Sequence, residues 1–209
     1  RVSQFGAMFG AASAFFSGFA LIGIMLTNSA QKKALELQKQ ELEEVADNQR
    51  KALNLQIILA FMDDIAADEF RQASGVLFEY ERAGKLARYG ELRHKPDREA
   101  QEEAEYQRLD SARRRFVHVF HKMKRLHDGG AVDLFTVRTV FSPDLVWTLL
   151  LIDEPMEEAI RANYNHDTFV FFQGLYEPED ILGQWPRTPG NPLPARLKGS
   201  AFDPHHAET

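Results

Sequence analysis

The stretch FGAMFGAASAFFSGFALIGIML, from Phe5 to Leu26, is apolar or small at almost every position. It lies inside a longer segment, from Val2 to Gln31, that contains no charged side chain. A bilayer core about 30 Å thick is crossed by ~20 helical residues of this kind. The stretch therefore predicts a single transmembrane helix, which we assign to residues 1–30.

A cleaved signal peptide is the alternative interpretation of this stretch, with Thr27–Ala30 as a small-residue cleavage site. Signal cores are typically about 7–15 residues long, whereas this apolar run is longer. Asn28 also fits the small-x-small pattern poorly. These two observations favour a membrane span.

Small residues recur at every fourth position of the predicted span, at Gly6, Gly10, Ala14 and Gly18. Close backbone approach across such residues is a main source of helix association in lipid, and this spacing suits a right-handed crossing. The repeat predicts a helix-packing interface. The alternative is that it reflects the ordinary abundance of glycine in membrane helices.

Basic residues follow the predicted span rather than precede it. Lys32, Lys33, Lys39, Arg50 and Lys51 lie after it, and only Arg1 lies before it. Because loops on the cytoplasmic side carry an excess of lysine and arginine, we expect the C-terminal bulk of the chain to be cytoplasmic. The expected location is the bacterial inner (cytoplasmic) membrane, with a single pass.

Residues 31–56 are predicted to form a helical stalk, because good helix formers dominate and neither glycine nor proline interrupts the chain from Gln31 to Met62. Leu35 and Leu42 keep a seven-residue spacing with Gln49 and Gln56, and a companion series contains Gln38, Val45, Ala52 and Leu59. A seam formed by Leu35, Leu42, Val45 and Ala52 would make a weak coiled coil, since half of its positions are polar. A solvated single helix is the open alternative.

Residues 57–177 are predicted to form a compact helical domain. Apolar stripes at helical spacing include one from Leu55 to Ile65, and a long charged helix runs from Arg98 to His127 before Gly129 and Gly130 end it. Asp133 and Ser142 are expected to cap the next two helices. No segment alternates cleanly enough to form a sheet, so the predicted fold class is all-α: one span, a stalk, a small bundle and a tail.

Residues 178–209 are predicted to be an extended, proline-rich tail, because six of the nine prolines lie between Pro178 and Pro204. We expect this tail to lie against the chain's own helical domain or a neighbouring subunit. Trp185 and Phe202 are the expected anchors.

Composition limits the possible functions. A net charge of −6 argues against a dedicated nucleic-acid binder, and the absence of cysteine excludes disulfides and thiolate metal sites. No glycine-rich phosphate loop, nucleophile elbow or His-Glu-x-x-His pattern is present. We therefore expect no catalytic, cofactor-binding or metal-binding residues, and we expect that the protein is not an enzyme.

Charged residues in the predicted domain are interpreted as solvated. The basic run of α-helical residues from Arg113 to Arg125 either covers solvated faces or contacts acidic lipid, a phosphate or an acidic partner. The neighbouring acids Asp153 and Glu154 are interpreted as caps or surface charges, because adjacent residues point in different directions around a helix. His118 and His121 share one side of a helix but lack a metal-binding pattern.

Several short motifs resemble those of a known family. They are Leu37–Gln40, Asp68–Arg71, the stretch from Phe116 to Leu126 followed by Gly129, Gly130 and Asp133, and Trp147 with Arg161. In these the chain resembles bacterial membrane proteins of unknown function that pair one N-terminal span with a Gln-rich helix and a compact helical domain. The resemblance implies a membrane-tethered helical module and transfers no active-site residue.

These observations predict a membrane-anchored structural or interaction protein, a scaffold or accessory subunit of an oligomeric assembly. Its expected partners are the lipid bilayer and either itself, another integral membrane protein or both, with no nucleic acid. The alternative is a membrane-tethered sensor or effector, for example in stress or phage defence, whose helical domain binds a ligand or partner.

Overall fold

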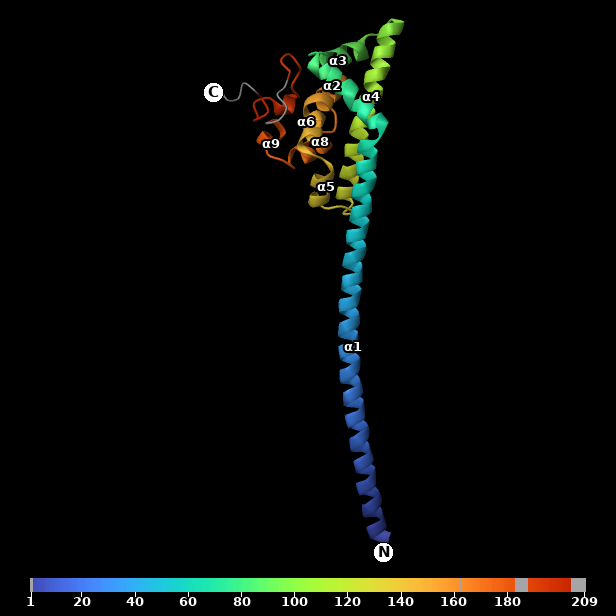
Figure 1. The fold of residues 1–209 in the computed structure, drawn as a ribbon. Coiled ribbons are helices and arrows are strands. Elements are labelled where there is room, and N and C mark those ends of the chain that lie inside the picture. The colour runs from blue at the N-terminus through green and yellow to red at the C-terminus, as the bar shows by residue number, and fades with distance from the viewer. Residues whose placement is uncertain (1, 162, 183–187, 204–209) are drawn as a thin grey trace. The chain divides into compact units, whose positions relative to one another are not determined.

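The computed structural model describes residues 2–161, 163–182 and 188–203, and within them it is all-helical, which confirms the all-α part of the predicted fold class. For residues 2–12 and 14 it describes the backbone alone. The chain divides into two units, residues 1–53 and residues 54–209. Figure 1 shows the order of the helices within each unit.

Helix α1, Val2–Ala66, is a single helix of 65 residues that contains the apolar stretch and the predicted stalk. It is continuous because strong helix formers follow Gln31 without glycine or proline. It ends at Ala66. The next residue, Ala67, has a φ of −60° and a ψ of 142°, which break the helical backbone before α2 begins at Asp68.

Among the residues whose side chains the structure describes, no individual helix combines the length and the apolar character needed to cross a membrane. One pair of helical segments, Leu134–Val140 and Pro143–Ile160, meets these requirements only when taken together, and it is bent by 85°.

The second unit contains the end of α1 and a series of shorter helices. These are α2 (Asp68–Arg82), α3 (Ala87–His94), α4 (Ala100–Asp128), α5 (Leu134–Val140), α6 (Pro143–Thr148), the π-helical turn η1 (Leu149–Asp153), α7 (Glu154–Ile160), α8 (Asp167–Gln173), α9 (Pro178–Leu182) and the 3₁₀ turn η2 (Ala195–Leu197). Helix α4 is the longest of the complete helices in this unit, and α2 packs along it.

An aromatic cluster forms the centre of this unit. The ring centroid of Phe120 on α4 lies 4.6 Å from that of Phe141 and 5.0 Å from that of Phe172 on α8. Phe61 on α1 extends the cluster, at 6.2 Å from Phe141. Because these rings come from distant parts of the sequence, their tilted and edge-to-face contacts hold α1, α4 and α8 together.

Local signals set the ends of the central helices. Glu99 and Glu102 form a capping box at the start of α4, so each satisfies a backbone N–H that the helix leaves unpaired. After α4 the chain reverses at Gly130, whose φ of +71° is favourable for glycine. Asp133 then caps α5 by accepting a hydrogen bond from the Thr136 N–H at 2.8 Å.

The prediction that residues 178–209 are extended throughout is wrong at the start of the segment. Pro178–Leu182 forms α9, because proline is tolerated in the first turn of a helix and Glu179 and Asp180 favour the same turn. Ile181 on α9 is fully buried, which fixes this short helix against the domain.

The rest of the described C-terminal segment packs on the domain of its own chain. Leu197 and Phe202 are buried in the core. The Asn191 side chain donates a hydrogen bond of 2.8 Å to the backbone carbonyl of Glu81, so it satisfies the end of α2. Trp185, the other expected anchor, lies outside the described residues.

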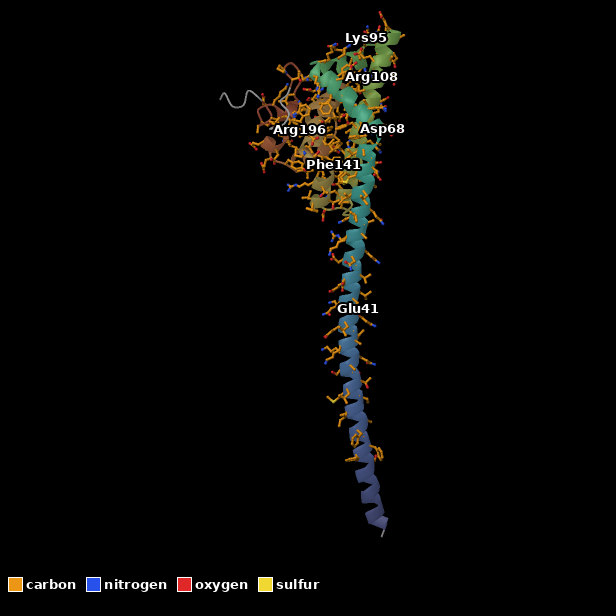
Figure 2. All side chains as sticks on the ribbon, viewed as in Figure 1. Glu41, Asp68, Lys95, Arg108, Phe141 and Arg196 are labelled. Carbon is orange, nitrogen blue, oxygen red and sulfur yellow. The ribbon has the colours of Figure 1, made fainter. Side chains whose placement is uncertain are left out.

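An ion pair holds this segment at Arg196, which Figure 2 labels beside the helices. The Arg196 Nε and Nη2 donate to the two carboxylate oxygens of Glu154 at 2.5 and 2.7 Å. The Tyr164 hydroxyl donates to the same carboxylate at 2.7 Å. Glu154 is fully buried, so these donors replace the water that it loses on folding.

Replacing Arg196 by alanine should therefore destabilise the domain by roughly 3 kcal/mol, because it leaves a buried carboxylate without its charged partner. The measurement is urea unfolding of the full chain in a non-ionic detergent, followed by tryptophan fluorescence. Lys198→Ala, at an exposed position of the same segment, is the matched control. Equal stability of the two variants would contradict the assigned role of the ion pair.

Candidate interaction surface and buried charge network

The part of α1 in the second unit has two different apolar faces. Phe61 is buried in the core, and Ile57, Ile58 and Ile65 pack against it. Leu55, Leu59 and Met62 remain 56%, 52% and 45% exposed. We call these three residues the outer stripe.

The outer stripe differs from an ordinary solvated helix face. The run ALNLQIILAFM, residues 52–62, contains no charge, although a helix that covers a core with one face normally carries charges on the other. Leu59 lies two residues from Phe61, about 200° around the helix, so the core cannot cover both. This uncharged, exposed face makes the outer stripe a candidate interaction surface.

The first unit carries apolar side chains along its described length. Phe15, Phe16 and Phe19 are exposed, and so are the large residues from Leu21 to Leu26. Leu35, Leu42, Val45 and Ala52, the predicted seam, are also exposed. Within the single chain these residues share a helix but are not covered by another element of the described structure.

The predicted glycine ridge is described only in part. Gly18 is exposed, and a Cβ placed on it would meet nothing within 4 Å. The surroundings of Gly6, Gly10 and Ala14 lie outside the described side chains, so their helix-packing role stays a prediction.

The second unit also contains a buried charge network that the sequence interpretation missed. Arg113 on α4 is only 5% exposed and Asp153 at the end of η1 is fully buried. The Arg113 Nη1 lies 4.0 Å from Asp153 Oδ1 and pairs closely with Glu157 on α7. Its Nε donates to the Tyr89 hydroxyl at 3.2 Å, and that hydroxyl donates to Asp110 at 2.6 Å.

The interpretation of Asp153 and Glu154 as caps or surface charges is wrong, because both are fully buried. They lie at the junction between the π-helical turn and α7, where Asp153 faces Arg113 on α4 and Glu154 faces Arg196 in the C-terminal segment. A π-helical turn changes the register of the following helix, and such turns are common at functional sites.

A sequence signal for this network exists on α4. Arg113 follows the buried Leu109 by four residues and precedes the buried Phe116 by three. It therefore occupies the apolar face of the helix, where a charge needs a buried partner.

Burial raises the pKa of Asp153 to about 8, although the nearby Arg113 acts to lower it, and Glu157 and Glu154 raise it further. Neither carboxyl oxygen of Asp153 has a hydrogen-bond partner among the described residues. Burial acts to lower the pKa of Arg113, but Asp153, Tyr89 and Glu157 together raise it above its ordinary value. Around neutral pH, therefore, Arg113 is charged and Asp153 largely protonated.

The two histidines on α4 have different surroundings. His121 Nδ1 lies 2.8 Å from the Thr168 hydroxyl, and burial lowers the pKa of His121. His118 is exposed. Over the described residues, no group of three or more His, Cys, Asp or Glu side chains is arranged to hold a metal ion.

Comparison of the chain with protein-family models, curated proteins and solved structures finds no match. The family resemblance therefore rests on the sequence motifs alone.

The pKa of Asp153 predicts a pH dependence of stability. Its folded value of about 8 exceeds its ordinary value of 3.8, so between these pH values the folded state holds a proton that the unfolded state has lost. Its contribution to stability is complete below pH 4 and is lost as the pH rises through 8. From pH 6 to pH 9 the free energy of unfolding should fall by roughly 3 kcal/mol more in the parent than in Asp153→Asn.

The measurement is urea unfolding of the full chain at pH 6 and pH 9, followed by tryptophan fluorescence. Asp144→Asn, which changes an exposed acid on α6, is the control and should keep the parent's pH dependence. A pH dependence that is identical in Asp153→Asn and the parent would show that Asp153 is ionised at both pH values.

Proposed function

We propose that this protein is a membrane-anchored interaction protein that assembles through α1 and displays its helical domain on the cytoplasmic side of a bacterial inner membrane. The observation that carries this proposal is the nature of α1. Its N-terminal part combines an uncharged segment, Val2–Gln31, with exposed aromatic and aliphatic side chains on one continuous helix.

The physical argument for an anchor is the fate of this apolar surface. Phe15, Phe16 and Leu26 are each more than 65% exposed, so water would contact all of them in an isolated chain. Transfer of such side chains out of water is favourable by about 25 cal/mol per Å². A helix forms its backbone hydrogen bonds internally, so it can lie in lipid. The apolar side chains on its surface therefore support lipid as the surrounding medium.

The argument for assembly rests on two features of the same helix. The small-residue repeat from Gly6 to Gly18 provides a surface for close helix contact in lipid. Beyond the lysines, the seam and the outer stripe supply exposed leucines at helical spacing. Copies anchored in one membrane are parallel and locally concentrated, which allows a half-polar seam to associate. Another integral membrane protein is the second class of partner that these surfaces accommodate.

The anchor is tested by fractionation. The full chain should remain in the membrane pellet after alkaline carbonate extraction. Ile22→Glu combined with Gly18→Glu should release a large part of it, because each charge is costly in a bilayer. Leu42→Glu, in the seam, should stay in the pellet. Extraction of the parent chain would contradict the anchor, and periplasmic activity of an alkaline phosphatase fused after Thr209 would contradict the orientation.

Self-association is tested at the small-residue repeat. Replacing Gly10 and Ala14 by leucine should hold the backbones apart and weaken association by on the order of 1 kcal/mol, without loss of membrane insertion. Crosslinking in membranes measures the oligomer fraction. Ala12→Leu, which adds a leucine on another face of the helix, is the control. An unchanged oligomer fraction in the double variant would contradict the proposed contact.

A further inference from the structure

A hollow of about 340 Å³ lies outside α1, over the buried charge network. Its lining consists of Arg93, Tyr106, Asp110, Arg113, Arg114, Ile160 and Arg161. Four of these seven side chains are guanidinium groups. They come from α3, from α4 and from the residue that follows α7.

Close packing of α3 on α7 holds two walls of the hollow together. A Cβ added to Gly90 would lie 2.9 Å from the Ala159 Cβ, so only glycine allows this approach. The His94 Nε2 and the carbonyl oxygen of Ala159 are also 2.8 Å apart. Arg93 is therefore positioned by a helix that packs closely on α7, and Arg161 by the end of α7, which it directly follows.

The local charge balance is positive. The four arginines face only two carboxylates, those of Asp110 in the lining and of Glu157. Asp153, which lies below them, is largely protonated at neutral pH. Arg113, at 5% exposure, supplies a fixed charge at the base. Positive charges in a concave site with low-dielectric walls concentrate anions.

The existing ion pairs leave donors for a ligand. Arg114 donates to Asp110 through Nε at 2.7 Å, and Arg161 pairs with Glu157 through Nη2 at 3.0 Å. Each arginine has five N–H groups, so these contacts use only part of its capacity. Arg93 is exposed and its Nη1 donates to the Tyr106 hydroxyl at 3.1 Å, which leaves its other N–H groups directed to a ligand or to solvent.

We propose that this arginine-lined hollow binds a phosphate group. The planar guanidinium fork matches phosphate oxygens, and charges from three elements can contact a tetrahedral anion from several directions. The volume exceeds that of the phosphate alone, and Tyr106 and Ile160 provide walls for the group attached to it. This site goes beyond the proposed membrane assembly and does not depend on it.

A ligand can enter the hollow without breaking the existing ion pairs. The Arg114 and Arg161 side chains are 71% and 67% exposed, whereas their partners Asp110 and Glu157 are only 11% and 12% exposed and hold their places. A dianion therefore shares these arginines with the two carboxylates and gains several charge-assisted hydrogen bonds. The buried pair of Arg113 with Glu157 stays in place as the base of the site.

Calorimetric titration of the full chain in a non-ionic detergent tests the proposal, with inorganic phosphate as the probe and sodium chloride holding the ionic strength constant. Arg93→Gln and Arg161→Gln should each raise the dissociation constant at least tenfold. Arg125→Gln removes a charge from an exposed position of α4 outside the hollow and should leave it unchanged. Unfolding curves of all three variants establish that the domain remains folded.

A second titration uses dioctanoyl phosphatidic acid. Tighter binding of this lipid than of inorganic phosphate, lost in Arg93→Gln, supports a lipid phosphate as the ligand. Equal or weaker binding of the lipid, with the same loss, supports a free phosphate compound. Absence of phosphate binding, or equal affinity in Arg93→Gln, Arg161→Gln and Arg125→Gln, overturns the proposal.

Discussion

Two consecutive buried acids, Asp153 and Glu154, are the constraint on which the second unit depends. Each is fully removed from solvent, and each faces an arginine from a distant part of the chain. Arg113 serves Asp153 from α4, and Arg196 serves Glu154 from the C-terminal segment. An unpaired buried charge costs several kcal/mol, so the pairing of Glu154 with Arg196 and of Arg113 with Glu157 restricts the arrangements of α4, α7 and the C-terminal segment that the chain can adopt.

The same constraint explains why the C-terminal segment belongs to the domain. Proline-rich composition alone favours an extended conformation with exposed backbone. Here Ile181, Leu197 and Phe202 fill the core, and Asn191 and Arg196 pair with groups on α2 and α7. Restricted proline conformations reduce the entropy that this segment loses on packing, which makes a few anchors sufficient.

The sequence predicted those features that depend on local chemistry. The all-helical class, the end of α4 at Gly129 and Gly130 and the cap at Asp133 follow from helix propensity, glycine geometry and side-chain capping. Pro178, Glu179 and Asp180 favour a first helical turn, but a helix as short as α9 also depends on the burial of Ile181, which local composition does not report. The burial of Asp153 was missed because its partner, Arg113, is forty positions away, and the π-helical turn that places it has no simple sequence pattern.

The buried network and the arginine hollow share Arg113, so the two are electrostatically coupled. At neutral pH the protonation of Asp153 removes one negative charge from below the hollow, and this leaves the guanidinium charge available to a ligand above it. Conversely, an anion held beside Arg113 adds negative charge near Asp153 and favours its protonated form. By linkage, anion binding in the hollow therefore increases the proton affinity of Asp153, and protonation of Asp153 increases the anion affinity of the hollow by the same factor. The stability of the domain and the occupancy of the hollow therefore depend on the same arginine.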